Sequence, residues 1–143
     1  ANMVKNGGFE ALEKLSAEAK RYMAPLPIDY IPDEEAAGMF GMMMMGGGKH
    51  ADPENMAKAQ ALKDATMGWF IVRHLKSKLV HLNGNYHSDF KKGIVTYLSK
   101  YRPGLKIATV CSVRQDEIDK LGEENRGRAD FYICVPTDMT MTY

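Results

Sequence analysis

Residues 79 to 90 read Leu79-Val80-His81-Leu82-Asn83-Gly84-Asn85-Tyr86-His87-Ser88-Asp89-Phe90. The aliphatic and β-branched run at the start predicts a strand over 78–83, and Asn83-Gly84-Asn85 is typical of the turn that ends a strand. Ser88 is a candidate cap for a following helix, because apolar residues recur beyond it at helical spacing. We therefore expect Tyr86 and His87 at a strand-to-helix junction, which is where α/β sheets usually hold their ligands.

Four blocks of sequence carry a resemblance to a known family. They are Gln60-Ala61-Leu62-Lys63-Asp64-Ala65-Thr66-Met67, Gly84-Asn85-Tyr86-His87 with Gly93-Ile94, Arg102-Pro103-Gly104-Leu105-Lys106-Ile107, and Ala129-Asp130-Phe131-Tyr132. In this order they resemble the Gln-x-x-x-Asp-x-x-Met helix, the Gly-x-x-His block with the segment that follows it, and the last strand of the ChaN-like haem-binding proteins, in the Tiki/TraB superfamily. The resemblance is closest over residues 53–135 and looser before them.

This resemblance implies a cofactor, a site and a cellular setting. The cofactor is haem, and the positions that match the family motifs, and so are implied to bind it, are His87, Tyr86 and Asp64. The implied function is haem binding in bacterial iron or haem uptake. The implied location is outside the cytoplasm, in the periplasm or anchored to the outer membrane, with a lipid anchor outside this chain as the membrane attachment.

One departure from the family pattern concerns the amino-terminal part. The family domain normally begins with a further half that carries a Gly-Glu-x-His block, and no such block occurs in residues 1–143. The chain therefore resembles the carboxyl-terminal part of a single ChaN-like domain. A missing amino-terminal half or a homo-oligomer, such as a dimer, would complete it.

Composition narrows the class of protein. The chain has 143 residues, 45% of them hydrophobic, which suits one domain or part of one. Lys and Arg number 19 against 18 Asp and Glu, and this balance argues against a nucleic-acid-binding protein dominated by phosphate contacts. The chain starts at Ala1, as an exported precursor after cleavage or a cut chain would. Cys111 and Cys134 lie in apolar runs, which favours small buried side chains over a zinc site.

The segments around the central stretch predict an α/β fold with a partial sheet of about three strands flanked by long helices. The sheet would need an absent amino-terminal half or a partner chain to cover its edge. Asp52-Pro53-Glu54 is a strong helix start, with a cap, a proline at the first position and an acid in the first turn. The expected helices cover 9–23, a methionine-rich segment capped by Asp33, 53–76 and 89–101; the expected strands cover 78–83, 105–113 and 129–135; and 114–125 is a surface turn or short helix.

Two features leave alternatives open. Asp64 shares a helical stripe with Gln60, Met67 and Ile71, and it is either a solvated surface carboxylate or, as the resemblance implies, a site residue facing the same cleft as His87. The methionine-rich segment, with Met39, Phe40 and four consecutive methionines from Met42 to Met45, is either a buried core helix, a pliable wall for a large flat apolar ligand, or a subunit interface.

The site chemistry also allows more than one reading. Tyr86 is either a phenolate ligand of ferric haem or a packing aromatic with its hydroxyl at the rim. Haem would also need cationic partners for its propionates, and the candidates are Lys49, Arg73 and Lys92. The alternative from another class is a metal- or His/Asp-dependent hydrolase of the same superfamily, with His87 as general base and Asp64 orienting it. A third reading is a structural half-domain in an assembly.

Overall fold

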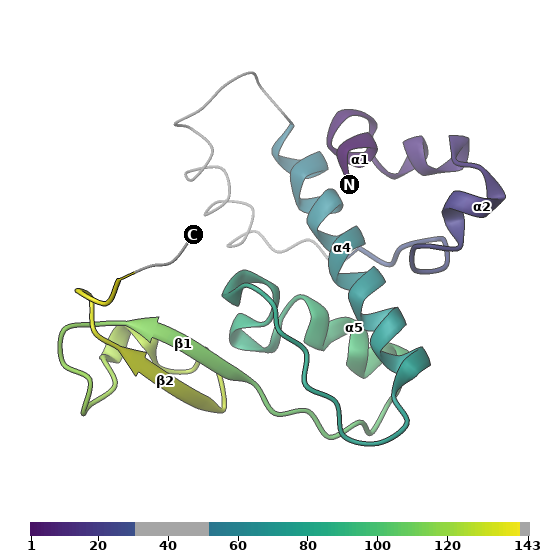
Figure 1. Ribbon diagram of the computed structural model, residues 1–143. Coiled ribbons are helices and arrows are strands. Elements are labelled where there is room, and N and C mark those ends of the chain that lie inside the picture. Colours follow the sequence, from purple (N-terminus) through teal and green to yellow (C-terminus); the bar gives the residue numbers. More distant parts are fainter. Residues whose placement is uncertain (31–51, 141–143) are drawn as a thin grey trace. The chain divides into compact units, whose positions relative to one another are not determined.

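The computed structural model describes residues 1–30 and 52–140, and the chain divides into two compact units, Ala1–His74 and Leu75–Tyr143. The first unit is helical in its described part. Its elements, drawn in Figure 1, are α1 (Asn2–Gly7), the 3-10 helix η1 (Phe9–Lys14), α2 (Ala17–Lys20) and α4 (Pro53–His74). Among these residues α1 packs against α4, and Val4 of α1 is fully buried.

The expectation of one continuous helix over 9–23 is wrong. The backbone leaves helical conformation at Leu15, and the Ser16 side chain caps a new helix by accepting a hydrogen bond from the Ala19 N–H at 3.1 Å. Serine competes with the helix for backbone hydrogen bonds, so it favours a cap over a helix interior. The apolar spacing of this segment therefore does not produce one amphipathic helix.

The long helix α4 confirms the expectation for 53–76 to within two residues. Asp52 Oδ1 accepts the Glu54 N–H at 3.0 Å, as a helix cap does. The side that carries Met56, Ala59 and Leu62 is buried, as the spacing predicts. Thr66 of α4 holds the preceding segment, because its hydroxyl accepts the Ala24 N–H at 3.2 Å.

The second unit contains a small parallel sheet and several short helices. Its elements are η2 (Asn85–His87), η3 (Asp89–Lys91), α5 (Ile94–Tyr101), β1 (Val110–Arg114), η4 (Glu123–Asn125) and β2 (Phe131–Val135). The two strands pair in parallel, with Val110 opposite Phe131 at one end and Arg114 opposite Val135 at the other. The described chain is thus mixed helix and strand, in line with the α/β class, and its strands number two rather than the expected three.

The predicted strand over 78–83 is wrong, and two other boundaries move. Residues 75–84 form no helix or strand, and the side chains of Val80 and Leu82 are 86% and 89% exposed. Strand propensity depends on packing against a neighbouring strand, and this run has none within the described residues. The two observed strands are shorter than expected, and the helix expected over 89–101 is interrupted where Gly93 takes a positive φ of 55°.

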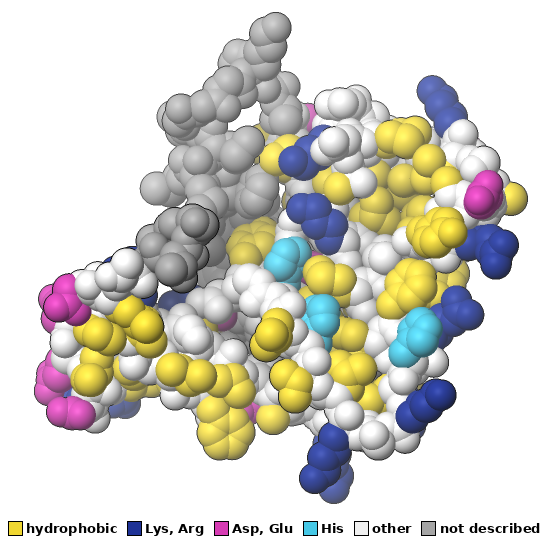
Figure 2. Space-filling view, in the orientation of Figure 1, with side chains coloured by type: hydrophobic (Ala, Val, Ile, Leu, Met, Phe, Trp, Pro, Cys, Tyr) yellow, Lys and Arg dark blue, Asp and Glu magenta, His cyan; other side chains and the backbone are white. Residues whose placement is uncertain are grey.

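The direction of the backbone groups in the sheet follows from two hydrogen bonds. The Phe131 N–H donates to Thr109 O at 3.0 Å, and the Gln115 N–H donates to Val135 O at 3.1 Å. In a parallel ladder alternate residues face the partner strand, so the backbone groups of Tyr132 and Cys134 face away from β1. Hydrophobic side chains gather on the visible surface over β1 and β2 (Figure 2).

Two further findings concern the chain as a whole. The methionine-rich helix expected after Asp33, with Met39 to Met45, lies outside the described residues, as do Lys49 and His50. Within residues 1–30 and 52–140, no helix combines the length and the apolar character needed to cross a bilayer.

Candidate functional site

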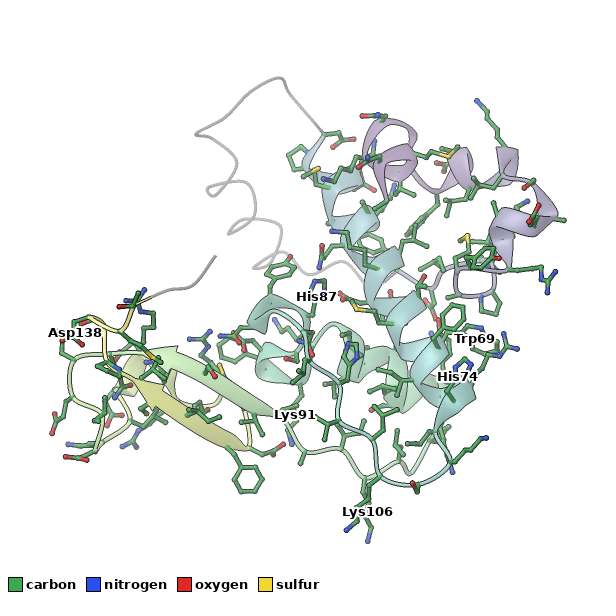
Figure 3. The ribbon with its side chains drawn as sticks, in the orientation of Figure 1. Trp69, His74, His87, Lys91, Lys106 and Asp138 are labelled. Atoms are coloured by element: carbon green, nitrogen blue, oxygen red, sulfur yellow. The ribbon has the colours of Figure 1, made fainter. Side chains whose placement is uncertain are left out.

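Tyr86 and His87 lie in the one-turn 3-10 helix η2. The His87 N–H donates to Gly84 O and the Ser88 N–H donates to Asn85 O, both at 2.9 Å. The two rings meet edge to face, with centroids 6.2 Å apart and planes at 82°. Both side chains are partly exposed, and Figure 3 labels His87 on this turn. The turn therefore presents a phenol and an imidazole side by side.

The expected strand-to-helix junction is not what positions these residues. In the described residues 1–30 and 52–84 no strand precedes them, and α5 begins seven residues after His87, at Ile94. Ser88 does not cap a helix with its side chain, because its hydroxyl accepts the Asn83 amide N–H at 3.0 Å. Asn83 also donates to Gly84 O at 2.9 Å, so the Asn83-Gly84-Asn85 segment stabilises the turn itself.

Contacts with the sheet fix this turn from one side. The Asn85 amide N–H donates to Ser112 O of β1 at 2.9 Å, on the edge of β1 that faces away from β2. The Phe90 N–H donates to Arg128 O at 2.8 Å. A residue on each side of Tyr86 and His87 is thus bonded to the backbone of the sheet or of the segment that leads into β2.

Two ion pairs also hold the residues that follow Tyr86 and His87. Both Arg128 Nη2 and Nε donate to Asp89 Oδ2, at 2.6 Å and 2.9 Å. The side chains of Arg128 and Asp89 are only 24% and 16% exposed, so this charge-assisted pair is partly shielded from water. Lys91 Nζ lies 2.6 Å from Asp130 Oδ1 (Lys91 is labelled in Figure 3). We call residues 85–91 with their partners Ser112, Arg128 and Asp130 the loop clamp.

The electrostatics of the loop clamp agree with its geometry. The hydrogen bond from the Lys91 ammonium, followed by that from the Thr109 N–H, lowers the pKa of Asp130 from 3.8 to about 2. Thr109 donates to Asp130 Oδ2 through both its N–H, at 2.8 Å, and its hydroxyl, at 3.0 Å. Burial raises the pKa of the Cys111 thiol, and the nearby Asp89 carboxylate adds to the rise. Cys111 is buried, as its apolar run predicts, and Cys134 is only half-buried.

Asp64 lies in α4 of the first unit and is 4% exposed. The alternative of a solvated surface carboxylate is therefore wrong. Gln60, one turn earlier on the same stripe, is also buried, so this stripe joins the apolar side of the helix. That Asp64 faces the same cleft as His87 stays a prediction, because the two residues belong to different units.

The remaining candidates separate into the two units. His74 stacks on Phe70 with ring centroids 5.9 Å apart, and Arg73 lies 5.8 Å from the Trp69 ring (Trp69 and His74 are labelled in Figure 3). These contacts are at the end of α4, whereas Lys92 is exposed in the same loop as His87. Among the described residues no group of three or more His, Cys, Asp or Glu side chains lies close enough to hold a metal ion.

The donor groups of the turn fit haem. Haem iron accepts imidazole nitrogen or phenolate oxygen as an axial ligand, and η2 carries one of each. The ring of haem is apolar, and Phe90 in the same loop exposes 54% of its surface. Lys92, which is exposed in the same loop, carries a cation of the kind that pairs with a propionate.

The residues that hold the turn were not predicted from the sequence as site residues. Asp89 and Arg128 are 39 positions apart, and nothing in the local pattern of either residue indicates that they meet. Asp130 stands in the block that resembles the last family strand, and its neighbour in sequence, Phe131, begins β2.

Comparison with known proteins gives one match. The family model described as "Haem-binding uptake, Tiki superfamily, ChaN" matches residues 1–98. No curated protein and no solved structure matches the chain. The matched range covers both Asp64 and the Tyr86–His87 turn and ends inside α5, before β1 begins.

Proposed function

The chain belongs to the haem-binding uptake family ChaN of the Tiki superfamily, and from this premise we propose that it binds haem at the Tyr86–His87 turn. The observation that carries the proposal is the pairing of the two side chains. A phenol and an imidazole stand edge to face on a turn that is anchored on both sides. Anchoring reduces the ordering cost that a flexible loop would incur on binding a ligand.

Each residue has a distinct role in this proposal. Either His87 or Tyr86 would hold the iron, and the other side chain would pack against the ligand or hydrogen-bond to it. Lys92 pairs with a propionate. Asp64, which is buried in α4, is the third residue that we propose for haem binding. Haem, when bound, would supply an iron centre, and these residues would hold it.

Titration of the protein with haem, followed by its Soret band, tests the proposal. His87→Ala should weaken binding and shift the spectrum, because an axial donor or its hydrogen-bond partner is lost. Tyr86→Phe separates the roles: a tyrosinate ligand would lose its charge-transfer band, and a packing aromatic would not. His81→Ala is the matched control, since His81 is exposed in the irregular segment 75–84.

The result that would overturn the proposal is equally direct. If the His87→Ala and Tyr86→Phe proteins bind haem with the affinity and spectrum of the unaltered protein, the ligand is held elsewhere.

We place this activity in bacterial iron or haem uptake, in the periplasm or at the outer membrane. The partners we propose are a second copy of the chain, or an amino-terminal half of the same domain. The support is the family and the small size of the sheet, which has two strands in the described residues. Fractionation of the source cells and the mass of the native protein in solution test these points.

A hydrolase built on His87 and Asp64 is the second candidate. Its support is that the family match covers both residues and that Asp64 is buried rather than solvated. A screen with ester, amide and phosphoester substrates, with and without added divalent metal, tests it. Activity that is lost in both His87→Ala and Asp64→Asn would favour this candidate over a haem carrier.

A further inference from the structure

The turn that carries Tyr86 and His87 is held by residues from beyond the family match. Arg128 lies 30 positions after the last matched residue, 98, yet it makes three of the bonds that reach this loop. Its side chain grips Asp89 through Nη2 and Nε, and its backbone carbonyl accepts the Phe90 N–H. Asp89 is only two residues from His87.

The Arg128 guanidinium is fixed by hydrogen bonds to two different residues. Its third nitrogen, Nη1, donates to Asn125 Oδ1 at 2.8 Å, and Asn125 is itself buried. The guanidinium is a planar fork, so bonds to Asp89 and Asn125 together define its orientation. A lysine at this position would keep the charge and lose this planar geometry.

The backbone between Asp89 and α5 needs such a restraint. Phe90 and Lys91 both have a φ of 57°, in the left-handed region that residues with a side chain rarely adopt. Two such residues in succession are unfavourable unless the surrounding contacts compensate. The compensating contacts are the Phe90–Arg128 hydrogen bond and the Lys91–Asp130 ion pair.

We propose that Arg128 and Asp89 are positioning residues for the Tyr86–His87 turn, and that they hold it in the conformation that binds haem. This inference rests on the proposed function. It goes beyond it by assigning a role in ligand binding to the segment after residue 98. The partners that orient a metal ligand typically change affinity by about 10- to 100-fold when they are removed, and we expect a loss in this range.

The variants follow from the contacts. Arg128→Gln removes the charge and the fork, and Asp89→Asn/Arg128→Gln removes both charges so that neither is left partly buried and unpaired. Arg128→Lys is the conservative variant. It keeps the charge, so it should retain part of the haem affinity that Arg128→Gln loses. Arg126→Gln is the matched control, because Arg126 forms an exposed ion pair with Glu123 at 2.7 Å and lies two residues away.

The first readout is amide hydrogen exchange in the haem-free protein. In Arg128→Gln, the N–H groups of His87 and Ser88, which close the turn, should exchange faster. The Phe131 N–H, which bonds within the sheet, should keep its protection. This pattern separates a loosened turn from a general loss of stability.

The second readout is haem affinity. Support for the proposal is faster exchange at the turn, haem binding about 10- to 100-fold weaker, partial rescue in Arg128→Lys and no effect in Arg126→Gln. Unchanged affinity in Arg128→Gln, with haem bound normally by the unaltered protein, overturns the positioning role and leaves the proposed function standing. Loss of protection at Phe131 in every Arg128 variant, the double variant included, assigns the pair to general stability and overturns it too. An unaltered protein that binds no haem overturns both, and the exchange data then still show whether Arg128 holds the turn.

Discussion

Phe90 and Lys91 each carry backbone strain, a few residues after the Tyr86–His87 turn. Both have left-handed backbone conformations, and Phe90 is largely exposed. Phe90→Gly should therefore stabilise the protein by about 0.5–1 kcal/mol, because glycine adopts this region without steric cost and little buried surface is lost. Urea unfolding at equilibrium measures the change.

The control for this prediction is Phe90→Ala. Alanine removes the same ring but keeps a Cβ, so it should give no gain. Equal effects of glycine and alanine would mean that the ring and not the backbone determines the result.

Asp130 gives a prediction about pH. Its pKa is lowered from 3.8 to about 2 in the folded protein, so the unfolded chain binds its proton more readily. The contribution of Asp130 to stability is therefore complete above about pH 4 and is lost as the pH falls through 2. Asp130→Asn should remove this contribution and flatten the fall in urea midpoint between pH 5 and pH 2.5.

Asp138→Asn is the matched control for that experiment. Asp138 is an exposed carboxylate eight residues later (labelled in Figure 3), and its removal should leave the pH profile as it is. A profile that is the same for Asp130→Asn and the unaltered protein would contradict the prediction.

At the residue scale, the sequence named Tyr86 and His87 as candidate ligands, and this role stays a prediction. They were chosen through an expected strand-to-helix junction, which the structure does not contain, and through the family motif Gly84-Asn85-Tyr86-His87, which lies within the matched range. Asp89, Arg128 and Asp130 act through contacts between distant positions, and such contacts have no local pattern. Asp64 was proposed as a site residue through the family resemblance, and this role stays a prediction. Its burial is shown, and it depends on packing that helical spacing alone leaves open.

At the scale of elements, the prediction that depended on residues within one helical turn is confirmed, and the one that depended on a distant partner strand is wrong. The start of α4 was predicted well because Asp52, Pro53 and Glu54 act within one turn. The strand over 78–83 was predicted wrongly because a strand exists only through its partner. The prediction of one helix over 9–23 is wrong because the Ser16 side chain caps a new helix there, and this capping outweighs the apolar spacing.

The anchoring of the segment before the methionine-rich stretch gives a prediction on α4. Ala24 is 1% exposed and its N–H has the Thr66 hydroxyl as acceptor. Thr66→Val keeps the shape and removes the acceptor, so it should destabilise the first unit by about 1–3 kcal/mol, the cost of a buried unsatisfied N–H. Chemical denaturation followed by Trp69 fluorescence measures the loss.

Thr66→Ser retains a hydroxyl and serves as the control. It should cost clearly less than valine does. A valine variant as stable as the serine variant would contradict a role for the Thr66 hydroxyl as the acceptor.

At the scale of the whole molecule, the chain has two units, and the family match includes residues of both. The match runs across the boundary at residues 74 and 75, so both units contribute to the family sequence. The segment 75–84 between α4 and η2 has no regular structure and exposes large apolar side chains. Exposed segments of this kind are preferred sites of proteolysis.

Brief trypsin treatment should therefore cut after Lys76 or Lys78 before it cuts within α4 or α5. Mass spectrometry of the first products identifies the bonds. Cleavage inside either helix while the bonds after Lys76 and Lys78 persist would contradict the prediction. The same digest with haem added shows whether the ligand protects this segment.

The outward edge of β2 has a practical consequence for anyone who handles this protein. Within the described residues, no hydrogen bond reaches the backbone N–H and C=O groups of Tyr132 and Cys134, and the strand from Phe131 to Val135 carries no charged residue and no proline. Natural sheets usually protect such an edge with lysine, proline or a bulge. At high concentration, strands of other molecules will therefore tend to pair with the edge of β2. Replacing Ile133 by a charged residue is the smallest change that would oppose this association and keep the protein in solution.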